Sequence, residues 1–274
     1  MNQFILKYKF PAAVFFISVF LIFASLLFKF EQKRQTEKNY IEFLTAQRVA
    51  LEAELKALQD TKEKIYLLGE FEPTQRDDFA PVPAPYGISG HQMYLRKETL
   101  EAFLQMAAAA DKDDVDLKIA SATRNFDYQK NLWNNKWIGY MKSIPDGFER
   151  FEKILEYSAV PGASRHHWGT DIDINNANPQ YFNTEQGEKV YTWMTKNAWE
   201  FGFCQPYTSK GTARPEGYNE EKWHWSYLPL AQKFTEDYKT LITEDDIKGF
   251  NGDQYVVGQD LINKHVLGIN PECL

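Results

Sequence analysis

Residues 164–174 read SRHHWGTDIDI, and this stretch is the most informative one for the fold of the chain. Its second half, residues 170–174, alternates polar and apolar side chains, as a half-buried strand does. Asp171 and Asp173 should then share one face of a strand, and the isoleucine that follows each of them should occupy the other. Because two carboxylates on one face are costly without a counter-charge, the pattern indicates a nearby cation.

His166 stands seven residues before Asp173, and Gly169 between them permits a turn. An imidazole and a carboxylate can therefore reach one point from two sides of a bend. Taken alone, this spacing also fits a solvated strand face with a surface imidazole, because a motif is only a hypothesis until its structural context is found.

A second stretch, residues 221–225, reads EKWHW. Strict strand alternation would put Glu221 and His224 on opposite faces, so the chain must bend before Trp223 if both serve one site. The polar run at 216–222 makes a loop there plausible. The tryptophans of this stretch by themselves are more typical of a core than of a cofactor wall.

A third stretch, residues 121–124, reads SATR and follows an expected short strand over 117–122. A guanidinium at the end of that strand can hold a carboxylate through two parallel hydrogen bonds. Alone, Arg124 would be interpreted as a surface ion pair.

Together the three stretches predict one metal site. His166, Asp173 and His224 offer two imidazoles and a carboxylate, which is the ligand set of a catalytic zinc ion with one open position. Glu221, three residues before a ligand, would be the base that a water at such a site needs.

These segments resemble the zinc D-Ala-D-Ala carboxypeptidase family of the vancomycin-resistance (VanY) type, over about Leu95 to Tyr227. The family pattern E-x-W-H is met at residues 221–224. The pattern S-x-H-x-x-G-x-[AD]-x-D is met by Ser164, His166, Gly169, Asp171 and Asp173. The resemblance implies an enzyme that removes the terminal D-alanine from peptidoglycan stem peptides.

The resemblance also implies roles for individual residues. Zinc would be bound by His166, Asp173 and His224, with Glu221 as general base. The substrate would be contacted by Arg124, Gln129 and Ser164. Ala122 and Thr123 depart from the Gly-Tyr of the family, so an L,D-carboxypeptidase or an endopeptidase on the same polymer stays open, as does a non-catalytic peptidoglycan-binding protein. A serine hydrolase is disfavoured, since no G-x-S-x-G surrounds Ser164.

The N-terminus is of a different kind. No charged residue occurs from Phe10 to Phe28, a span just long enough to cross a hydrocarbon core. Residues 1–30 are therefore expected to be an uncleaved transmembrane anchor in a bacterial cell membrane. A cleaved signal peptide is the competing interpretation, although the stretch exceeds the usual apolar region and no A-x-A-like site follows.

Lysines and arginines flank the span on both sides and do not settle its orientation. We expect the N-terminus inside and the body on the periplasmic or extracellular side, because the implied chemistry belongs outside the cytoplasm. Residues 31–85 are predicted to be a helical stalk ending near Gly69, followed by a proline-rich linker. A leucine or isoleucine recurs every seven residues, but the companion row is poor, so a dimer through the stalk stays open.

All seven tryptophans lie between residues 133 and 225, which places the catalytic domain at about 86–240, with 241–274 as a C-terminal extension. Without a regular βαβ rhythm, an α+β domain is expected, a small mostly antiparallel sheet with packed helices. Its predicted elements are helices over 97–110, 127–140 and 185–201 and strands over 117–122, 170–174 and 223–227.

Charge and cysteine content add two limits. The chain has 31 basic and 38 acidic residues, a net charge of −7, and no basic run in its body, which argues against a nucleic-acid partner. Cys204 and Cys273 could pair in an oxidising compartment or remain two buried thiols, and sequence alone leaves both open.

Overall fold

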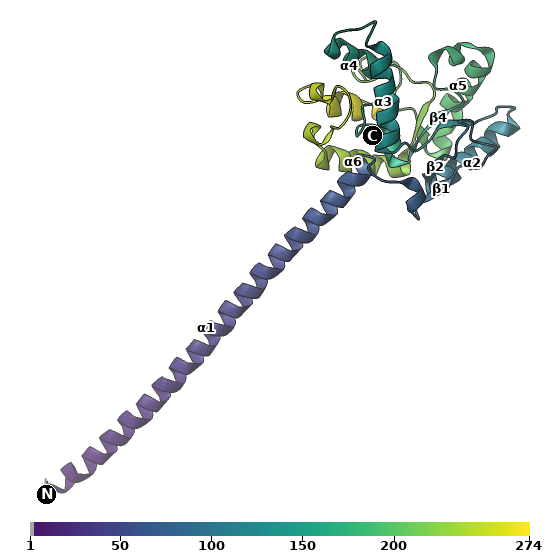
Figure 1. The fold of residues 1–274 in the computed structure, drawn as a ribbon. Coiled ribbons are helices and arrows are strands. Elements are labelled where there is room, and N and C mark those ends of the chain that lie inside the picture. The colour runs from purple at the N-terminus through teal and green to yellow at the C-terminus, as the bar shows by residue number, and fades with distance from the viewer. Residues whose placement is uncertain (1–2) are drawn as a thin grey trace. The chain divides into compact units, whose positions relative to one another are not determined.

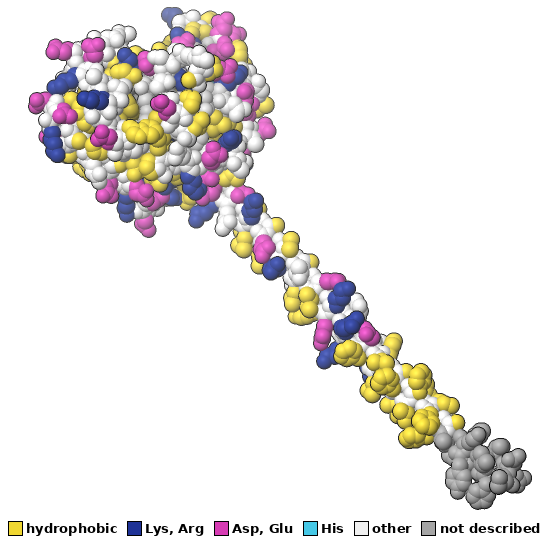
Figure 2. Space-filling model, turned by 180° about the vertical axis from the view of Figure 1, so that it is seen from behind, with side chains coloured by type: hydrophobic (Ala, Val, Ile, Leu, Met, Phe, Trp, Pro, Cys, Tyr) yellow, Lys and Arg dark blue, Asp and Glu magenta, His cyan; other side chains and the backbone are white. Residues whose placement is uncertain are grey.

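The computed structural model describes residues 3–274, with side chains described from residue 13 onward. The chain forms two units, one ending at Gln59 and one spanning Asp60–Leu274. Helix α1, Gln3–Leu67, makes up the described part of the first unit. Hydrophobic side chains gather on it next to the undescribed N-terminal residues, and charged ones follow further along (Figure 2).

In the described part of the chain, α1 is the one helix that is long and apolar enough to cross a membrane. Its aromatic side chains are exposed, with 65% exposure at Phe15 and 71% at Phe16. Lys7 and Lys9, the lysines that precede the apolar span, lie outside the described side chains.

The second unit is an α+β domain with small antiparallel sheets, as expected (Figure 1). Its helices are α2 (Lys97–Lys112), α3 (Phe126–Tyr140), α4 (Gly147–Leu155), α5 (Glu185–Asn197) and α6 (Leu228–Leu241). Its strands are β1 (Phe79–Pro81), β2 (Tyr94–Arg96), β3 (Ile119–Ser121), β4 (Asp171–Ile174), β5 (Phe203–Cys204) and β6 (His224–Tyr227).

The larger sheet has the antiparallel order β3-β4-β6-β5. Strand β4 is central, and its alternation follows the prediction. Ile172 and Ile174 are fully buried in a core formed with α2 and α5. The aspartates of the same strand lie on the other face, where the side chains of the candidate site gather.

Two parts of the chain differ from the expectation. Residues 79–81 are not part of an extended linker but form β1, which pairs with β2 and buries Phe79. The contact is close, since a Cβ at Gly169 would lie 2.5 Å from the Phe79 ring. Helices α4 and α6 were not predicted. Helix α4 has only nine residues. Both α4 and α6 bury one apolar face on a core that is assembled from segments distant in sequence.

The C-terminal extension, residues 241–274, is part of the second unit and packs against its helices. Cys204 and Cys273 form a disulfide with a Cα–Cα distance of 5.7 Å, which decides the question that the sequence left open. The Trp133 indole of α3 donates a 2.8 Å hydrogen bond to the Asn251 carbonyl. Tyr255 contacts aromatic rings of α3 and α4. The extension therefore completes the core beneath these helices.

Candidate metal centre

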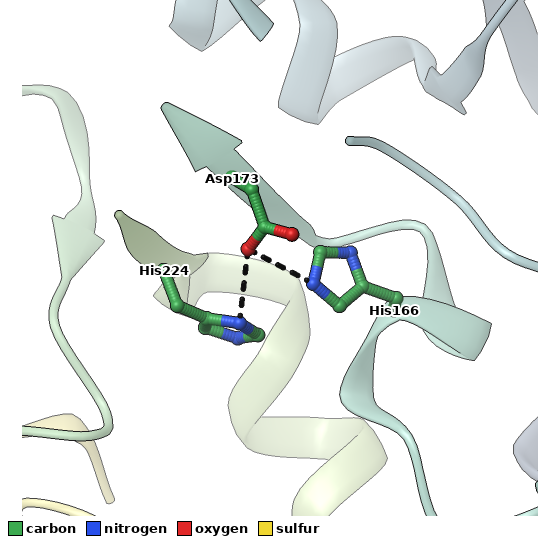
Figure 3. A group of neighbouring side chains, drawn as sticks. All are labelled: His166, Asp173 and His224. Atoms are coloured by element: carbon green, nitrogen blue, oxygen red, sulfur yellow. Dashed lines mark ion pairs between the residues drawn. The ribbon is translucent and has the colours of Figure 1, made fainter. Parts of the chain in front are cut away.

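The three predicted ligands come from three segments that the sheet brings together. Asp173 on β4 lies directly opposite His224 on β6 in the antiparallel register. His166 belongs to a short 3-10 turn, Arg165–Trp168, which ends at Gly169 in the left-handed conformation, with φ 73°. The turn folds the imidazole back over the strand that follows it, and the ligand atoms lie within 4.8 Å of one another (Figure 3).

The atoms that face the centre have few partners within the protein. Asp173 Oδ1 lies 3.2 Å from His166 Nε2 and 3.3 Å from His224 Nδ1. Neither approach has hydrogen-bond geometry at the two buried atoms His166 Nε2 and Asp173 Oδ1, which remain unpartnered. Buried polar atoms are nearly always satisfied, so this convergence of two nitrogens and an oxygen fits a bound cation. Two imidazoles and a carboxylate are a set that suits zinc.

The other ring nitrogen of each histidine faces away from the centre. His166 Nδ1 donates to the Ala122 carbonyl at 2.9 Å, which leaves the lone pair of Nε2 pointing into the centre. His224 Nε2 lies 3.6 Å from Asp171 Oδ1, too far for a hydrogen bond, and has no hydrogen-bond partner among the described residues. An outer partner such as the Ala122 carbonyl fixes the tautomer and orientation of a histidine that binds a metal.

Electrostatics favour a neutral His166 and an ionised Asp173. Burial, with the charge of Arg124, lowers the pKa of His166 to about 4. Burial alone would raise the pKa of Asp173, but the two histidines and Arg124 hold it well below its usual value. Burial likewise opposes the protonation of His224, yet Asp171 and Asp173 raise its pKa to about 9. A metal cation would replace that proton as the partner of the two carboxylates.

Glu221 lies beside the centre in a turn that precedes β6, the bend that the sequence required. Its Oε2 is 3.4 Å from His224 Nδ1. The turn is held by the Glu221 amide donating to Tyr207 O and by Gln205 Nε2 donating to Glu221 O. Burial raises the pKa of Glu221 to about 7, although His224 opposes the shift. A carboxyl group with such a pKa can accept and return a proton near neutral pH.

Arg124 lies on the other side of Asp173. Its Nη2 donates to Asp173 Oδ2 at 3.1 Å and its Nη1 to Gln129 Oε1 at 3.0 Å, while its buried Nε has no partner. The side-chain Nε2 of Gln129 also donates to Ala159 O at 2.7 Å. Gln129 thus orients Arg124, and its predicted contact with a substrate stays a prediction.

A pocket of about 540 Å³ opens onto all of these side chains. Ser164 lies in its wall, and the Tyr207 ring contacts the His224 ring at a tilt of 60°, with 4.9 Å between the ring centroids. The pocket brings together every residue that the sequence assigned to the site, namely His166, Asp173, His224, Glu221, Arg124, Gln129 and Ser164. Their roles toward metal and substrate remain predictions.

Two residues behind the site were not foreseen. His167 is fully buried, with Nδ1 2.6 Å from Arg124 O and Nε2 accepting from the Gly162 amide at 3.0 Å. Asp171 forms a buried pair with Arg165 at 3.4 Å. The shared strand face of the two aspartates was a signal for Asp171, whereas nothing in the sequence pointed to the partners of His167.

The sequence profile of the VanY family, described as D-alanyl-D-alanine carboxypeptidase, matches residues 88–230, just over half of the chain. A D-alanyl-D-alanine carboxypeptidase of Enterococcus faecalis is 28% identical over 157 residues, 55% of this chain and 56% of that protein. One of Enterococcus faecium is 26% identical over 161 residues, 58% of this chain and 46% of that protein. The chain thus spans about half the length of the curated relatives it matches.

Two solved structures are similar to the chain at a lower level. A variant of the vancomycin-resistance D,D-pentapeptidase VanY, in complex with Zn(II), is 24% identical, with a TM-score of 0.44, covering 64% of this chain and 93% of that one. The LD-carboxypeptidase LdcB is 24% identical, with a TM-score of 0.46, covering 68% and 79%. Each alignment covers about two thirds of this chain.

Proposed function

The chain belongs to the VanY family of D-alanyl-D-alanine carboxypeptidases, and on that premise we propose that it is a zinc-dependent hydrolase that removes the terminal D-alanine from peptidoglycan stem peptides. One observation carries the proposal. The buried, unpartnered atoms His166 Nε2 and Asp173 Oδ1 converge with His224 beside Glu221, a carboxyl group whose pKa burial raises to about 7.

The metal would be held by His166, Asp173 and His224. Zinc bound there supplies Lewis-acid chemistry, polarising a substrate carbonyl and lowering the pKa of water. The Ala122 carbonyl keeps the His166 imidazole oriented toward it, and the Asp171 carboxylate lies 3.6 Å behind the His224 ring.

Glu221 would be the general base and then the general acid. Its carboxylate accepts the proton of the water that attacks the scissile carbonyl. The same proton then passes to the leaving amine of D-alanine, which returns Glu221 to its ionised form. A pKa close to the working pH suits both transfers, since the group must be able to take the proton and release it.

Arg124 would restrict the reaction to free C-termini. Its unpartnered Nε is a buried donor at the pocket, and a terminal carboxylate would satisfy it with a charge-assisted hydrogen bond. Gln129 keeps the guanidinium in place through Nη1. Ser164 lines the same pocket and would contact the backbone of the peptide.

The long N-terminal helix would anchor the enzyme as a single-pass protein of the bacterial cell membrane. Its exposed apolar side chains support this, and the proposed substrate would require the catalytic domain to lie on the periplasmic or extracellular side. Association of two chains through the stalk is part of the same proposal and is tested by the oligomeric state in detergent.

The proposal is tested with Glu221→Gln in the full-length chain. We expect kcat for D-alanine release from a pentapeptide ending in D-Ala-D-Ala to fall about 10²–10⁴-fold, the usual contribution of a general base, with zinc content unchanged. Release at the wild-type rate would disprove the role of Glu221. Mass spectrometry of products from penta- and tetrapeptides separates D,D- from L,D-cleavage and from endopeptidase activity. A protein that releases no product from either peptide, with or without a chelator, would favour the non-catalytic binding protein.

A further inference from the structure

One ridge of helix α3 forms a wall of the pocket. Tyr128, Leu132, Lys136 and Tyr140 are spaced four residues apart, line the pocket together and are all exposed. Residues four apart lie one above the other on a helix. The ridge therefore leads from the region of Gln129 toward the outer end of the pocket.

Three of the four lysine and arginine side chains that line the pocket are in ion pairs. Arg165 pairs with Asp171, Arg124 with Asp173, and Lys153 with Glu156 at 2.9 Å. Lys136 is the fourth cation of the lining, and among the residues that the structure describes it forms no ion pair.

The Lys136 ammonium group donates to the Ser158 hydroxyl and has two further hydrogens for other acceptors. The Lys136 side chain as a whole is exposed, but desolvation of its ammonium group and the positive charge of Arg124 lower its pKa, while the negative charge of Glu221 opposes the shift. Ser158 belongs to a loop that is also tied to α3 through Gln129 and the Ala159 carbonyl. The loop thus helps to hold Lys136 in the lining of the pocket, where its ammonium group can bind an anion.

The position of Lys136 along α3 gives the distance to the bound end of a peptide. Lys136 follows Gln129 by seven residues, which is about 10 Å along a helix axis. An extended peptide covers the same length in about three residues, at roughly 3.3 Å each. If Arg124 and Gln129 mark the C-terminal carboxylate, Lys136 lies near the side chain of the third residue from the end.

We propose that Lys136 binds a carboxylate on the side chain of the third substrate residue, counted from the C-terminus. The inference rests on the proposed function, because the register of the peptide is set by Arg124. It makes Lys136 a specificity residue that favours stem peptides whose diamino acid has a free side-chain carboxylate. Lys153 supplies a matched contrast, since its charge in the same pocket is already used by Glu156.

The test uses two pentapeptides ending in D-Ala-D-Ala, with diaminopimelate or its side-chain carboxamide as the third residue. For the zinc-loaded full-length enzyme, we expect kcat/KM to favour the carboxylate about tenfold, the scale of a charge-assisted hydrogen bond. Lys136→Met should bring the ratio near one and Lys136→Glu should invert it, while Lys153→Met keeps the wild-type ratio. A wild-type ratio near one, or a ratio unchanged in Lys136→Met, overturns the inference.

Calorimetric binding of the same peptides to the Glu221→Gln variant separates this inference from the proposed function. Selective binding that Lys136→Met abolishes supports the role of Lys136 even where the wild type cuts neither peptide, a result that would count only against the proposed reaction. Equal binding of both peptides overturns the role of Lys136 whatever the wild type cuts.

Discussion

Asp171 and Asp173 lie two residues apart on β4, and each is paired with an arginine, but their surroundings differ. Asp171 accepts from Arg165, Ser226 and Thr170. Arg165 in turn donates through all three of its nitrogens. Asp173 instead has one oxygen on Arg124 and the other unpartnered between two imidazoles. Both oxygens of Asp171 are bonded within the protein, which we call the closed pair. One oxygen of Asp173 has no hydrogen bond and can bind a ligand, which we call the open pair.

The neighbouring histidines repeat the contrast. Both ring nitrogens of His167 have partners in the backbone, whereas His166 has one such partner and one free nitrogen. Residue type and burial are the same in each case, so neither distinguishes a structural residue from a functional one. In these two pairs the hydrogen bonds differ, and the buried atoms without a partner are the ones that face the proposed metal.

The largest expected effect is on zinc binding and comes from a substitution at Asp173. In Asp173→Asn, a neutral amide replaces the carboxylate between the imidazoles, and we expect loss of bound zinc and of measurable turnover. Asp171→Asn, the matched control, should keep zinc with an affinity lowered about 10–100-fold, as for other outer partners of metal ligands. Metal analysis and calorimetric titration measure both, and equal zinc affinity in the two variants would contradict the contrast.

Stability should respond in the opposite order. Asp171→Asn leaves the charge of Arg165 buried without a counter-charge, which typically costs about 3–5 kcal/mol in the free energy of unfolding. In the metal-free protein, Asp173→Asn should cost clearly less, because it removes a carboxylate whose inner oxygen has no hydrogen bond. Urea unfolding of both variants provides the comparison, and a larger loss for Asp173→Asn would show that the closed pair is not the structural one.

The smallest expected effect concerns pH and His167. Burial lowers the pKa of His167 to about 3, and its Nε2 must stay unprotonated to accept from Gly162. The folded pKa lies below the unfolded value of about 6.5, so the unfolded state binds the extra proton first and stability falls as pH drops below about 6.5. The contribution at pH 5.5 should be about 1 kcal/mol.

His167→Gln tests this in the chelator-treated protein. Its unfolding free energy should decline less steeply than that of the wild type between pH 7 and 5.5, because the buried titrating group is gone. Identical slopes would mean that His167 does not control the acid response. The matched comparison is Lys153→Met, which changes no buried histidine and should keep the wild-type slope.

Much of the fold followed from local patterns. The alternation of residues 170–174 predicted β4 and its two faces, and the ranges of α2, α3 and β6 were close to those observed. Helix α6 was missed although it has 14 residues. Helix α4 and strand β1 were missed because they are short, with nine and three residues, and their packing partners are distant in sequence. Phe79, for example, is buried against Gly169, ninety residues away.

The site divides in the same manner. Spacing and residue type were sufficient to single out His166, Asp173, His224 and Glu221, since these side chains carry chemistry that few other roles require. The acceptor for His166 Nδ1 is the carbonyl of Ala122, and a backbone group leaves no mark in a sequence. The same holds for the partners of His167 and for the disulfide between Cys204 and Cys273.

By itself the sequence predicted the proposed kind of chemistry and determined the apolar N-terminal helix and the α+β class, because each depends on residue type and local period. Only the tertiary structure decided which aspartate has all its oxygens bonded within the protein, that Gln129 holds Arg124, and that Lys136 forms no ion pair with any residue the structure describes. Those facts depend on distances between segments that are remote in the chain. Hydrogen bonds and ion pairs form or fail over less than an ångström, a scale that no sequence pattern reaches.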